Sequence, residues 1–302
     1  MKFEYYNSSN FRSIISDVYK LAPHQVEKDL YIYRSKYKYK NNYFHLPFQF
    51  YQPKEYFIDS KIKSFTKLLN SEIPISFNSI GEIKSLESHN IAINPILTID
   101  KNADPIDNYK RRFRTQIRKY KKYRIDERIK LYKSNNPIDL IIFYNHLAKS
   151  YTKHHKMIFQ PFKLYEKLIY EKGFMVLAKF ENKLLGGAFF IEDGQTLHYC
   201  WGSYSNTQEY SVASDILNFA INIAWKENYE YFDFGSTPLT DENLLFSKLK
   251  YGSEPLKVYQ YANFNKKNID LNNDLKFVRN IFSVSPVKFN KQISKYAVPF
   301  FV

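Results

Sequence analysis

The stretch YFDFGSTPLTDENLLFSKLKYG, residues 231–252, holds two side chains whose types and spacing could do chemistry. An acid, Asp233, follows a short apolar run, and a lysine, Lys248, comes fifteen residues later. Asp233-Phe234-Gly235 has the spelling of the tripeptide that holds magnesium in protein kinases, which also need a glycine-rich phosphate loop and a His-Arg-Asp loop. The chain has eight glycines, no G-x-G-x-x-G and no His-Arg-Asp. The sequence therefore excludes a protein kinase and leaves open what else this acid and lysine do.

Positive charge is concentrated in one segment. The chain carries a net charge of +15, and residues 110–133 contain twelve Lys or Arg against two acids, a local balance of +10. An exposed helix with few acids would explain this, but like charges one turn apart repel, which favours an anionic partner: nucleic acid, a phosphorylated small molecule or an anionic membrane surface. The candidate phosphate contacts are Arg111, Arg112, Arg114, Arg118 and Lys119, because basic side chains, guanidinium above all, bind phosphate.

Composition excludes several classes of protein. The single cysteine, Cys200, excludes an intramolecular disulfide framework and a cysteine-based metal site. Adjacent His154 and His155 would point apart on a helix, so we predict no metal. No stretch approaches the roughly 20 apolar residues of a membrane span, and the first residues lack the apolar core of a signal peptide. We expect a cytoplasmic globular protein.

Apolar periodicity and turn signals predict the elements that must position these residues. Before a boundary placed near Asp104, we expect helices over 8–21 and 55–69, a half-exposed strand over 31–40, and strands with turns over 73–106. After it, we expect in chain order a helix opened by Asp107 that runs to about 123, a strand over 128–133, helices from Pro137 and Pro161, strands over 174–180, 184–192 and 196–204, a helix over 211–226, a strand over 231–234, a helix over 241–251 and a strand over 256–261.

Three local features refine this prediction. Asp193-Gly194 is typical of a hairpin turn. Gly186-Gly187 inside a strand indicates a simple kink, a bulge or a close approach by another backbone or a ligand. The helix from Pro137 has an apolar face marked by Ile138, Ile141, Ile142, Asn145 and Ala148.

The element order resembles the GCN5-related N-acetyltransferase (GNAT) fold, a mixed α/β sheet splayed open in its middle. Within it, four segments resemble the Fem-type branch of aminoacyl- and acyltransferases that act on peptidoglycan precursors: NYKRRFRTQIRKYKKY, LAKFENKLLGGAFFIEDGQTLHYCWGSYSN, YFDFGS with FSKLKYG, and, more weakly, SVSPVKFNKQISKYAVP. The phenylalanine expected directly before Lys248 is displaced to position 246. The resemblance implies that residues 1–104 are a degenerate copy of the fold and that residues 105–302 form the acyltransferase domain with a helical tail.

The resemblance also implies roles for three side chains. Asp233 would accept a proton from the acceptor amine or orient it, Lys248 would stabilise the oxyanion, and Tyr199 would donate to the reacting carbonyl. For each there is a structural alternative: a turn former for Asp233, a solvated lysine for Lys248 and core packing for Tyr199 or its neighbour His198. Tyr251 matches the aromatic position of the same motif and is a candidate binding residue.

The donor should bind near the start of the helix over 211–226. Acetyl-CoA-dependent members of the fold place glycines there, so that backbone amides hold the pyrophosphate. This chain has NTQEYSVASD, which contains no glycine but retains Ser211 as a cap and possible anion contact. This departure argues against a conventional acetyl-CoA donor, and Fem-type relatives, which also lack these glycines, include members that use aminoacyl-tRNA. The resemblance implies no permanently bound cofactor and a donor that is acyl-CoA, acyl-carrier protein or aminoacyl-tRNA.

Two functions of different class follow. In the first, the chain is an N-acyltransferase that moves an acyl or aminoacyl group to an amine of a cell-envelope glycan or peptidoglycan-type precursor. In the second, it is a non-catalytic GNAT-like protein whose basic surface binds nucleic acid or another polyanion. Residues 277–302 could pack on the domain or lie on the inner face of a membrane.

Overall fold

The computed structural model describes residues 4–19, 21–27, 30–34, 43–44, 52–53, 59–70, 75–153, 160–205, 207 and 209–262. The chain divides into two compact units, one with residues 92–147 and 166–256 and the other with residues 2–91, 148–165 and 257–302. These units alternate along the chain, whereas the expected boundary near Asp104 divides it once. That boundary, and the identity of residues 1–104 as a degenerate copy, stay predictions.

A mixed sheet forms the centre of the first unit, as predicted. Its strands lie in the order β6–β11–β10–β9–β8–β7, and β12 also pairs with β6. All neighbours are antiparallel except β10 and β11, which are parallel. The strands are β6 (His89–Thr98), β7 (Lys130–Ser134), β8 (Gly173–Phe180), β9 (Lys183–Asp193), β10 (Thr196–Tyr204), β11 (Tyr231–Asp233) and β12 (Thr237–Pro238). The predicted hairpin joins β9 and β10, with Asp193 as the last residue of β9 and Gly194 and Gln195 in the turn.

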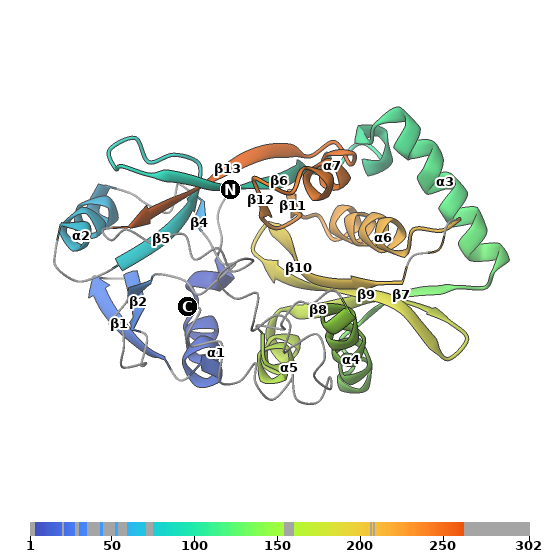
Figure 1. Cartoon of the computed structure of the whole chain (residues 1–302), viewed down its shortest axis with the longest axis horizontal. Helices are drawn as coiled ribbons and strands as arrows, with labels where there is room; N and C mark the ends of the chain where they lie inside the picture. The colour runs from blue at the N-terminus through green and yellow to red at the C-terminus, as the bar shows by residue number, and fades with distance from the viewer. Residues whose placement is uncertain are drawn as a thin grey trace. The chain divides into compact units, whose positions relative to one another are not determined.

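Helices cover both faces of this sheet because β8 and β9 are apolar on both sides. Figure 1 shows α6 (Val212–Lys226) on one face and α4 (Pro137–Lys153) on the other. A Cβ added to Gly186 would lie 2.9 Å from Val212 of α6, and one added to Gly187 would lie 2.8 Å from Phe143 of α4. The paired glycines therefore allow helix side chains to approach on opposite faces. At Gly186 the added Cβ would also lie 2.9 Å from the backbone carbonyl of Ser203 on β10, which is the expected approach by another backbone.

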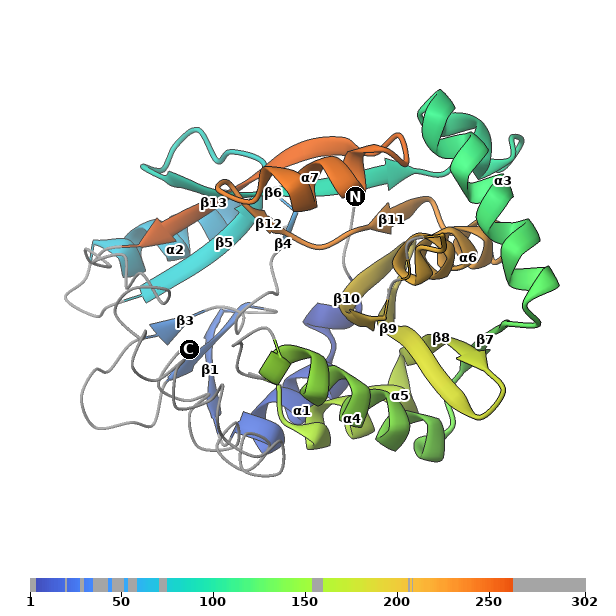
Figure 2. The same cartoon turned by 45° about the vertical axis from the view of Figure 1, so that its right-hand side comes forward.

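Four further elements complete the first unit. Figure 2 shows α3 (Arg111–Asp126) running beside α6. The short helix η3 (Pro105–Asn108) precedes α3, α5 (Phe162–Glu171) leads into β8, and α7 (Glu242–Leu249) follows β12. The core between α6 and the sheet joins Phe190, Ile216 and Phe232 with Tyr251 after α7.

Two sequence predictions in this unit are wrong. Asp107 does not open α3, because Asp104 caps η3 through the Ile106 N–H and the chain is extended at Tyr109 before α3 begins at Arg111. The face predicted to be buried on α4 is largely outside, with Ile138, Ile141 and Ile142 exposed by 67%, 50% and 38%. Two apolar stripes compete on this helix, and the stripe with Phe143 packs inward because Gly187 leaves room for that ring. The buried residues are Leu140, Phe143, Tyr144, Leu147 and Ala148.

The second unit is also α/β. Its strands lie in the order β1–β2–β3–β5–β13, and β4 pairs with β5. In a small core, Phe65 of the helix α2 packs against the sheet, with its ring centroid 4.1 Å from that of Phe77, which stacks on Tyr261. The elements are η1 (Tyr5–Asn7), α1 (Ser9–Tyr19), β1 (Ala22–Glu27), β2 (Leu30–Arg34), β3 (Tyr43–Phe44), β4 (Gln52–Pro53), α2 (Asp59–Leu69), β5 (Ile75–Ile80) and β13 (Glu254–Ala262).

Candidate functional site

The Asp-Phe-Gly stretch forms a bulge in the sheet of the first unit. The pairing of β11 with β6 ends with Asp233 opposite Ile96. The pairing of β12 with β6 then begins with Thr237 opposite Ile93. Three residues of one chain segment therefore oppose two of β6, and Gly235 takes a left-handed conformation with a φ of 71°. The tripeptide ends a strand as predicted, and bulges of this kind re-aim side chains next to active sites.

The Asp233 carboxylate is fully buried, and both of its oxygens are engaged. Oδ1 accepts hydrogen bonds from Asn94 Nδ2 at 3.0 Å and from the Gly235 N–H at 2.7 Å, and Oδ2 lies 2.8 Å from Nδ1 of His198. Donors around a carboxylate favour its ionised form and make it a poor acceptor for another proton. This geometry favours the turn-forming role for Asp233, and its role as a base stays a prediction.

Lys248 lies beside the turn that follows Asp233, and it belongs to the last turn of α7. Asp241 caps this helix by accepting from the Leu244 N–H, and the helix directs Lys248 inward. Lys248 Nζ donates to the Gly235 carbonyl at 2.7 Å and to the Ser236 carbonyl at 3.4 Å. Burial lowers the pKa of the Lys248 ammonium to about 8, although the nearby Asp233 and Asp241 carboxylates oppose this shift. Lys248 is therefore not the solvated lysine of the alternative interpretation.

β10 parts from β11 beside this bulge. Their parallel pairing ends at His198 opposite Asp233, whereas β10 continues to Tyr204. A bulge at Cys200 shifts the register of β10 against β9. Beyond it, the hydroxyls of Tyr204 and Tyr199 lie 3.2 Å apart, and burial raises the pKa of Tyr199. Both hydroxyls lie over Gly202, where a Cβ would come within 2.2 Å and 2.6 Å of them.

The start of α6 carries the predicted cap and an additional cation. Ser211 caps the helix by accepting from the Ser214 N–H, and Lys250 Nζ donates to the Ser214 hydroxyl at 3.2 Å. Burial lowers the pKa of Lys250, whose ammonium also lies 4.2 Å from the ring centroid of Phe113. Tyr251 is completely buried, and its hydroxyl donates to the Ser214 carbonyl at 3.3 Å. This position suits packing beneath the helix start rather than direct contact with a ligand.

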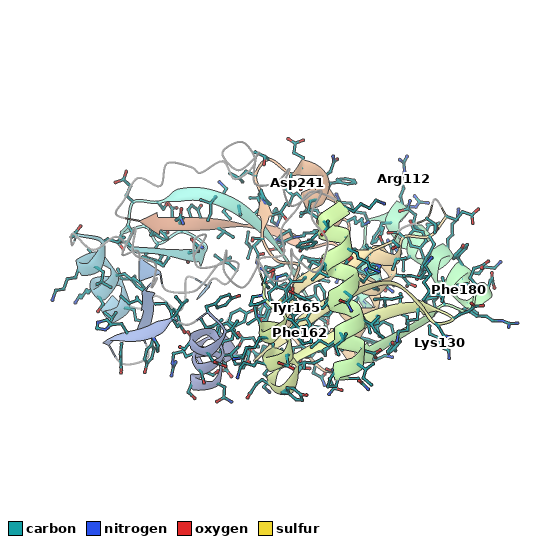
Figure 3. All side chains as sticks on the ribbon, turned by 60° about the horizontal axis from the view of Figure 1, so that its bottom comes forward. Arg112, Lys130, Phe162, Tyr165, Phe180 and Asp241 are labelled. Atoms are coloured by element: carbon teal, nitrogen blue, oxygen red, sulfur yellow. The ribbon has the colours of Figure 1, made fainter. Side chains whose placement is uncertain are left out.

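The basic cluster divides into engaged and exposed side chains. Arg124 pairs with the buried Asp215 at 2.8 Å and holds α3 against α6, and Arg114 lies 3.4 Å from Asp107. Figure 3 shows Arg112 extending away from α3. The exposed cations of α3 are Arg111, Arg112, Arg118, Lys119, Lys121 and Lys122. Four of the five predicted phosphate contacts are therefore accessible, and Arg114 is half-buried.

Sequence reasoning missed several residues here. Asn94 binds Asp233 from β6, Tyr204 joins Tyr199, and Lys250 lies at the start of α6. His198 was assigned to core packing although it bonds Asp233 directly. A histidine in the middle of a predicted central strand was the signal that could have marked it.

The described part of the chain contains neither a metal site nor a helix that could span a membrane. Within it, no group of three His, Cys, Asp or Glu is arranged to hold a metal ion. His154 and His155 lie outside the described residues. None of the described helices is both long and apolar enough to cross a membrane.

Comparison with known proteins shows similarity in fold alone. No family model matches the chain, and no curated protein matches it. The structure of FemX superposes with a TM-score of 0.61 at 12% identity, covering 92% of this chain and 95% of that one. L-PGS from Bacillus licheniformis superposes with a TM-score of 0.59 at 12% identity, covering 90% and 92%.

A third solved structure agrees with these two. The C-terminal domain of a protein assigned as a lysylphosphatidylglycerol synthetase from Agrobacterium fabrum superposes with a TM-score of 0.60 at 10% identity, covering 85% of this chain and 88% of that domain. The similarity spans nearly the whole of each chain, so it concerns the complete architecture. The chain therefore has a GNAT-like fold of the Fem type.

Proposed function

We propose that this chain is an N-acyltransferase that moves an acyl or aminoacyl group from an activated carrier to an amine of a cell-envelope glycan or peptidoglycan-type precursor. The Fem-type fold and the sequence resemblance support this class of reaction. The observation that carries the proposal is the geometry of Lys248, a buried ammonium beside the point where β10 and β11 part.

Lys248 has one donor to spare for a substrate. An ammonium has three N–H bonds, and two of them point at the carbonyls of Gly235 and Ser236. Among the contacts of the described residues, the third has no assigned partner. With a pKa of about 8, Lys248 is charged at neutral pH and can donate to an oxyanion in a site that excludes water.

The chemistry is a direct displacement. The acceptor nitrogen attacks the acyl carbonyl, a C–N bond forms, and the C–S or C–O bond to the carrier breaks to release its thiol or hydroxyl. Lys248 stabilises the tetrahedral oxyanion, and Tyr199, paired with Tyr204, donates to the reacting carbonyl or the leaving group. The proton of the attacking amine passes either to Asp233 or to the sulfur or oxygen of the departing carrier.

The donor would meet the protein at the start of α6. Ser211 and the half-buried Lys250 offer a hydroxyl and a cation there in place of the missing glycines. Exposed cations of α3 would contact further phosphates of the donor or acceptor. We expect the reaction to take place in the cytoplasm. Residues 277–302, for which packing on the domain and contact with the inner face of a membrane are the two alternatives, lie outside the described residues.

Native mass spectrometry with acyl-CoA, acyl-carrier protein and aminoacyl-tRNA would test the proposal, followed by transfer assays with the carrier that is retained. We expect one carrier to bind selectively and Lys248→Ala to lower turnover by about 100- to 1000-fold. Lys226→Ala is the matched control, since Lys226 is an exposed lysine at the end of α6. Unchanged turnover in folded Lys248→Ala would remove Lys248 from the mechanism.

The exposed cations of α3 favour one alternative, a non-catalytic protein that binds nucleic acid. In that case no carrier is retained selectively, RNA of any sequence binds, and affinity falls steeply with salt. The same mass spectra distinguish the two functions.

A further inference from the structure

The outer face of α3 carries many cations and few acids. Its exposed cations are the six named above, and the sequence contains no acid between positions 108 and 125. The aromatic side chains among them pack inward: the Tyr123 ring stacks on Tyr210 with centroids 5.4 Å apart, and the Tyr120 ring meets Tyr210 edge-on at 5.9 Å. Single-stranded RNA also needs aromatic side chains on which its bases stack, and those of α3 are engaged with Tyr210.

Exposed apolar side chains lie beside the start of this helix. α7 carries Phe246 and Leu244, exposed by 63% and 40%, and the turn before it carries Leu239, exposed by 48%. The Lys110 N–H donates to the Lys250 carbonyl at 3.0 Å, which joins the start of α3 to the end of α7 (Figure 1, Figure 2). The Lys110 ammonium lies 5.1 Å from the centroid of the Phe246 ring. We call the exposed cations of α3 and these three apolar side chains the α3–α7 surface.

The three apolar side chains indicate an interaction site. Phe246 is the phenylalanine displaced from the position directly before Lys248, and a shift of one position turns a side chain by about 100° around a helix. At position 246 the ring is more than half exposed. Single apolar residues scattered on a surface need no explanation, whereas a group rimmed by charged side chains is typical of a surface that binds a partner.

The loop between β10 and α6 takes its shape from its own side chains. The Thr207 N–H donates to the Tyr210 carbonyl at 3.1 Å, and the Tyr210 N–H donates to the Thr207 hydroxyl at 3.0 Å. Tyr210 is buried, and its hydroxyl donates to the Asp215 carboxylate at 2.7 Å. The loop contains no glycine that would let a pyrophosphate approach its backbone closely. These contacts disfavour a donor that is held by its nucleotide, as CoA is.

A carrier protein matches this combination of cations and apolar side chains. CoA and RNA present phosphates and bases, whereas a protein presents carboxylates and apolar side chains on one face. An RNA base stacked on Phe246 would share the ring with the Lys110 ammonium and would leave both leucines in water. A second copy of this chain would bring cations onto cations across a two-fold axis. Because α7 also bears Lys248, a carrier bound to its outer side lies beside the helix that supplies this ammonium.

We propose that the α3–α7 surface docks an acidic acyl-carrier protein, with the cations of α3 pairing with its carboxylates and Phe246, Leu244 and Leu239 packing on its apolar side chains. The role of this carrier as the donor rests on the proposed acyl transfer, whereas the docking does not. In the transfer step the C–N bond to the acceptor amine forms, the thioester C–S bond breaks, and the carrier leaves as the thiol.

Isothermal titration calorimetry of the full-length chain with an acyl-carrier protein that lacks its thiol-bearing arm tests docking without any chemistry. We expect Phe246→Ser to weaken binding by about 10-fold, as truncation of an aromatic anchor does. Replacing both Arg111 and Arg112 with glutamine should weaken it by about 10-fold as well. Salt at about 0.1 M keeps the effect of each charge local, because it screens charges more than about 10 Å apart.

Matched controls lie elsewhere in the first unit. Tyr170→Ser removes an aromatic side chain of α5 that is 71% exposed, and it should leave the affinity for the carrier unchanged. Replacing both Lys172 and Lys183, two exposed lysines, with glutamine lowers the net charge by the same amount as the arginine pair, and it should also have no effect. Equal losses in the controls, or a Phe246→Ser variant that binds the carrier as the wild type does, would overturn the proposal.

Parallel titrations identify a different occupant of the surface. If Phe246→Ser and the arginine pair weaken binding of RNA, of phosphatidylglycerol vesicles or of a second copy of the chain, while the carrier does not bind, the proposed partner is wrong. If the carrier docks as expected but its acylated form transfers nothing to any amine, the proposed function fails and the docking surface stands. If acyl-CoA or aminoacyl-tRNA supports transfer and the carrier does not bind, the docking surface fails and the proposed function stands.

Discussion

Replacing Lys248 with methionine should stabilise the protein while it lowers turnover by about 100- to 1000-fold. Burial lowers the pKa of Lys248 to about 8 from its ordinary value of 10.5. At about 1.4 kcal/mol per unit, this difference corresponds to a cost of about 3 kcal/mol for keeping the ammonium buried at neutral pH. Methionine has a similar length and no charge, but it leaves the carbonyls of Gly235 and Ser236 without their donor, which offsets about 1 to 2 kcal/mol. We expect a net gain of about 1 to 2 kcal/mol in the free energy of unfolding.

The stability difference between the wild type and the methionine variant should depend on pH in a defined direction. Because the folded pKa of Lys248 is below the unfolded one, the unfolded chain binds more protons between pH 8 and 10.5. Wild-type stability therefore rises through this window relative to the methionine variant, by about 1.4 kcal/mol at pH 9. Buried tyrosines such as Tyr109, whose pKa is raised by burial, act in the opposite direction above pH 10. They are present in both proteins and cancel in the difference.

Urea unfolding of both proteins at pH 7, 8 and 9 measures the effect, and transfer assays at the same pH values measure the loss of activity. Lys226→Met, at an exposed lysine of α6, should change neither quantity. A methionine variant that is less stable than the wild type by a margin independent of pH would refute the depressed pKa and the burial cost derived from it.

Three further predictions follow from the geometry of the first unit. Gly202→Ala would place a Cβ within 2.2 Å of the Tyr204 hydroxyl, so the tyrosine pair should move; we expect lower kcat with little loss of stability, checked by kinetics and thermal unfolding. Gly235→Ala should cost about 1 to 2 kcal/mol, because its φ of 71° disfavours a side chain, and this is checked by urea unfolding. Charge reversal at both Arg118 and Lys119 should weaken binding of an anionic donor or RNA and lower the salt dependence of that affinity by about one unit of slope per lost phosphate contact, whereas Lys172→Glu, at an exposed lysine directly after α5, should not.

The sheet of the first unit could be predicted largely from local patterns. Asp193-Gly194 fixes the hairpin of β9 and β10, and the apolar runs on either side fix the strands. The buried face of α4 could not be predicted in the same way. That helix carries two apolar stripes, and the choice between them depends on the space that Gly187 leaves for Phe143 on another strand.

For the site, too, some features could be predicted from the sequence and others could not. Asp233 and Lys248 could be selected from their types and spacing, since a strand and the following helix bring them together. The bonding of Asp233 to His198 could not, because it depends on the register between two strands whose contacting residues are 35 positions apart in the chain. The burial of Lys248 is a further property of packing, because a lysine near the end of a short helix is usually solvated.

The engagement of Asp233 has a consequence for the acceptor. If this carboxylate accepts no further proton, the attacking amine must arrive neutral without help from a strong base. An α-amino group, with a pKa of about 7.7 to 8.0, is about one third neutral at pH 7.5, whereas a lysine-like amine with a pKa of about 10.4 is neutral in about one molecule in a thousand. We therefore expect acceptors with weakly basic amines to react about 300-fold faster, and kcat/KM to follow the pKa of the acceptor in a series of amines. A rate that is independent of acceptor pKa would show that the protein supplies the base, and Asp233→Asn would then identify whether that base is Asp233.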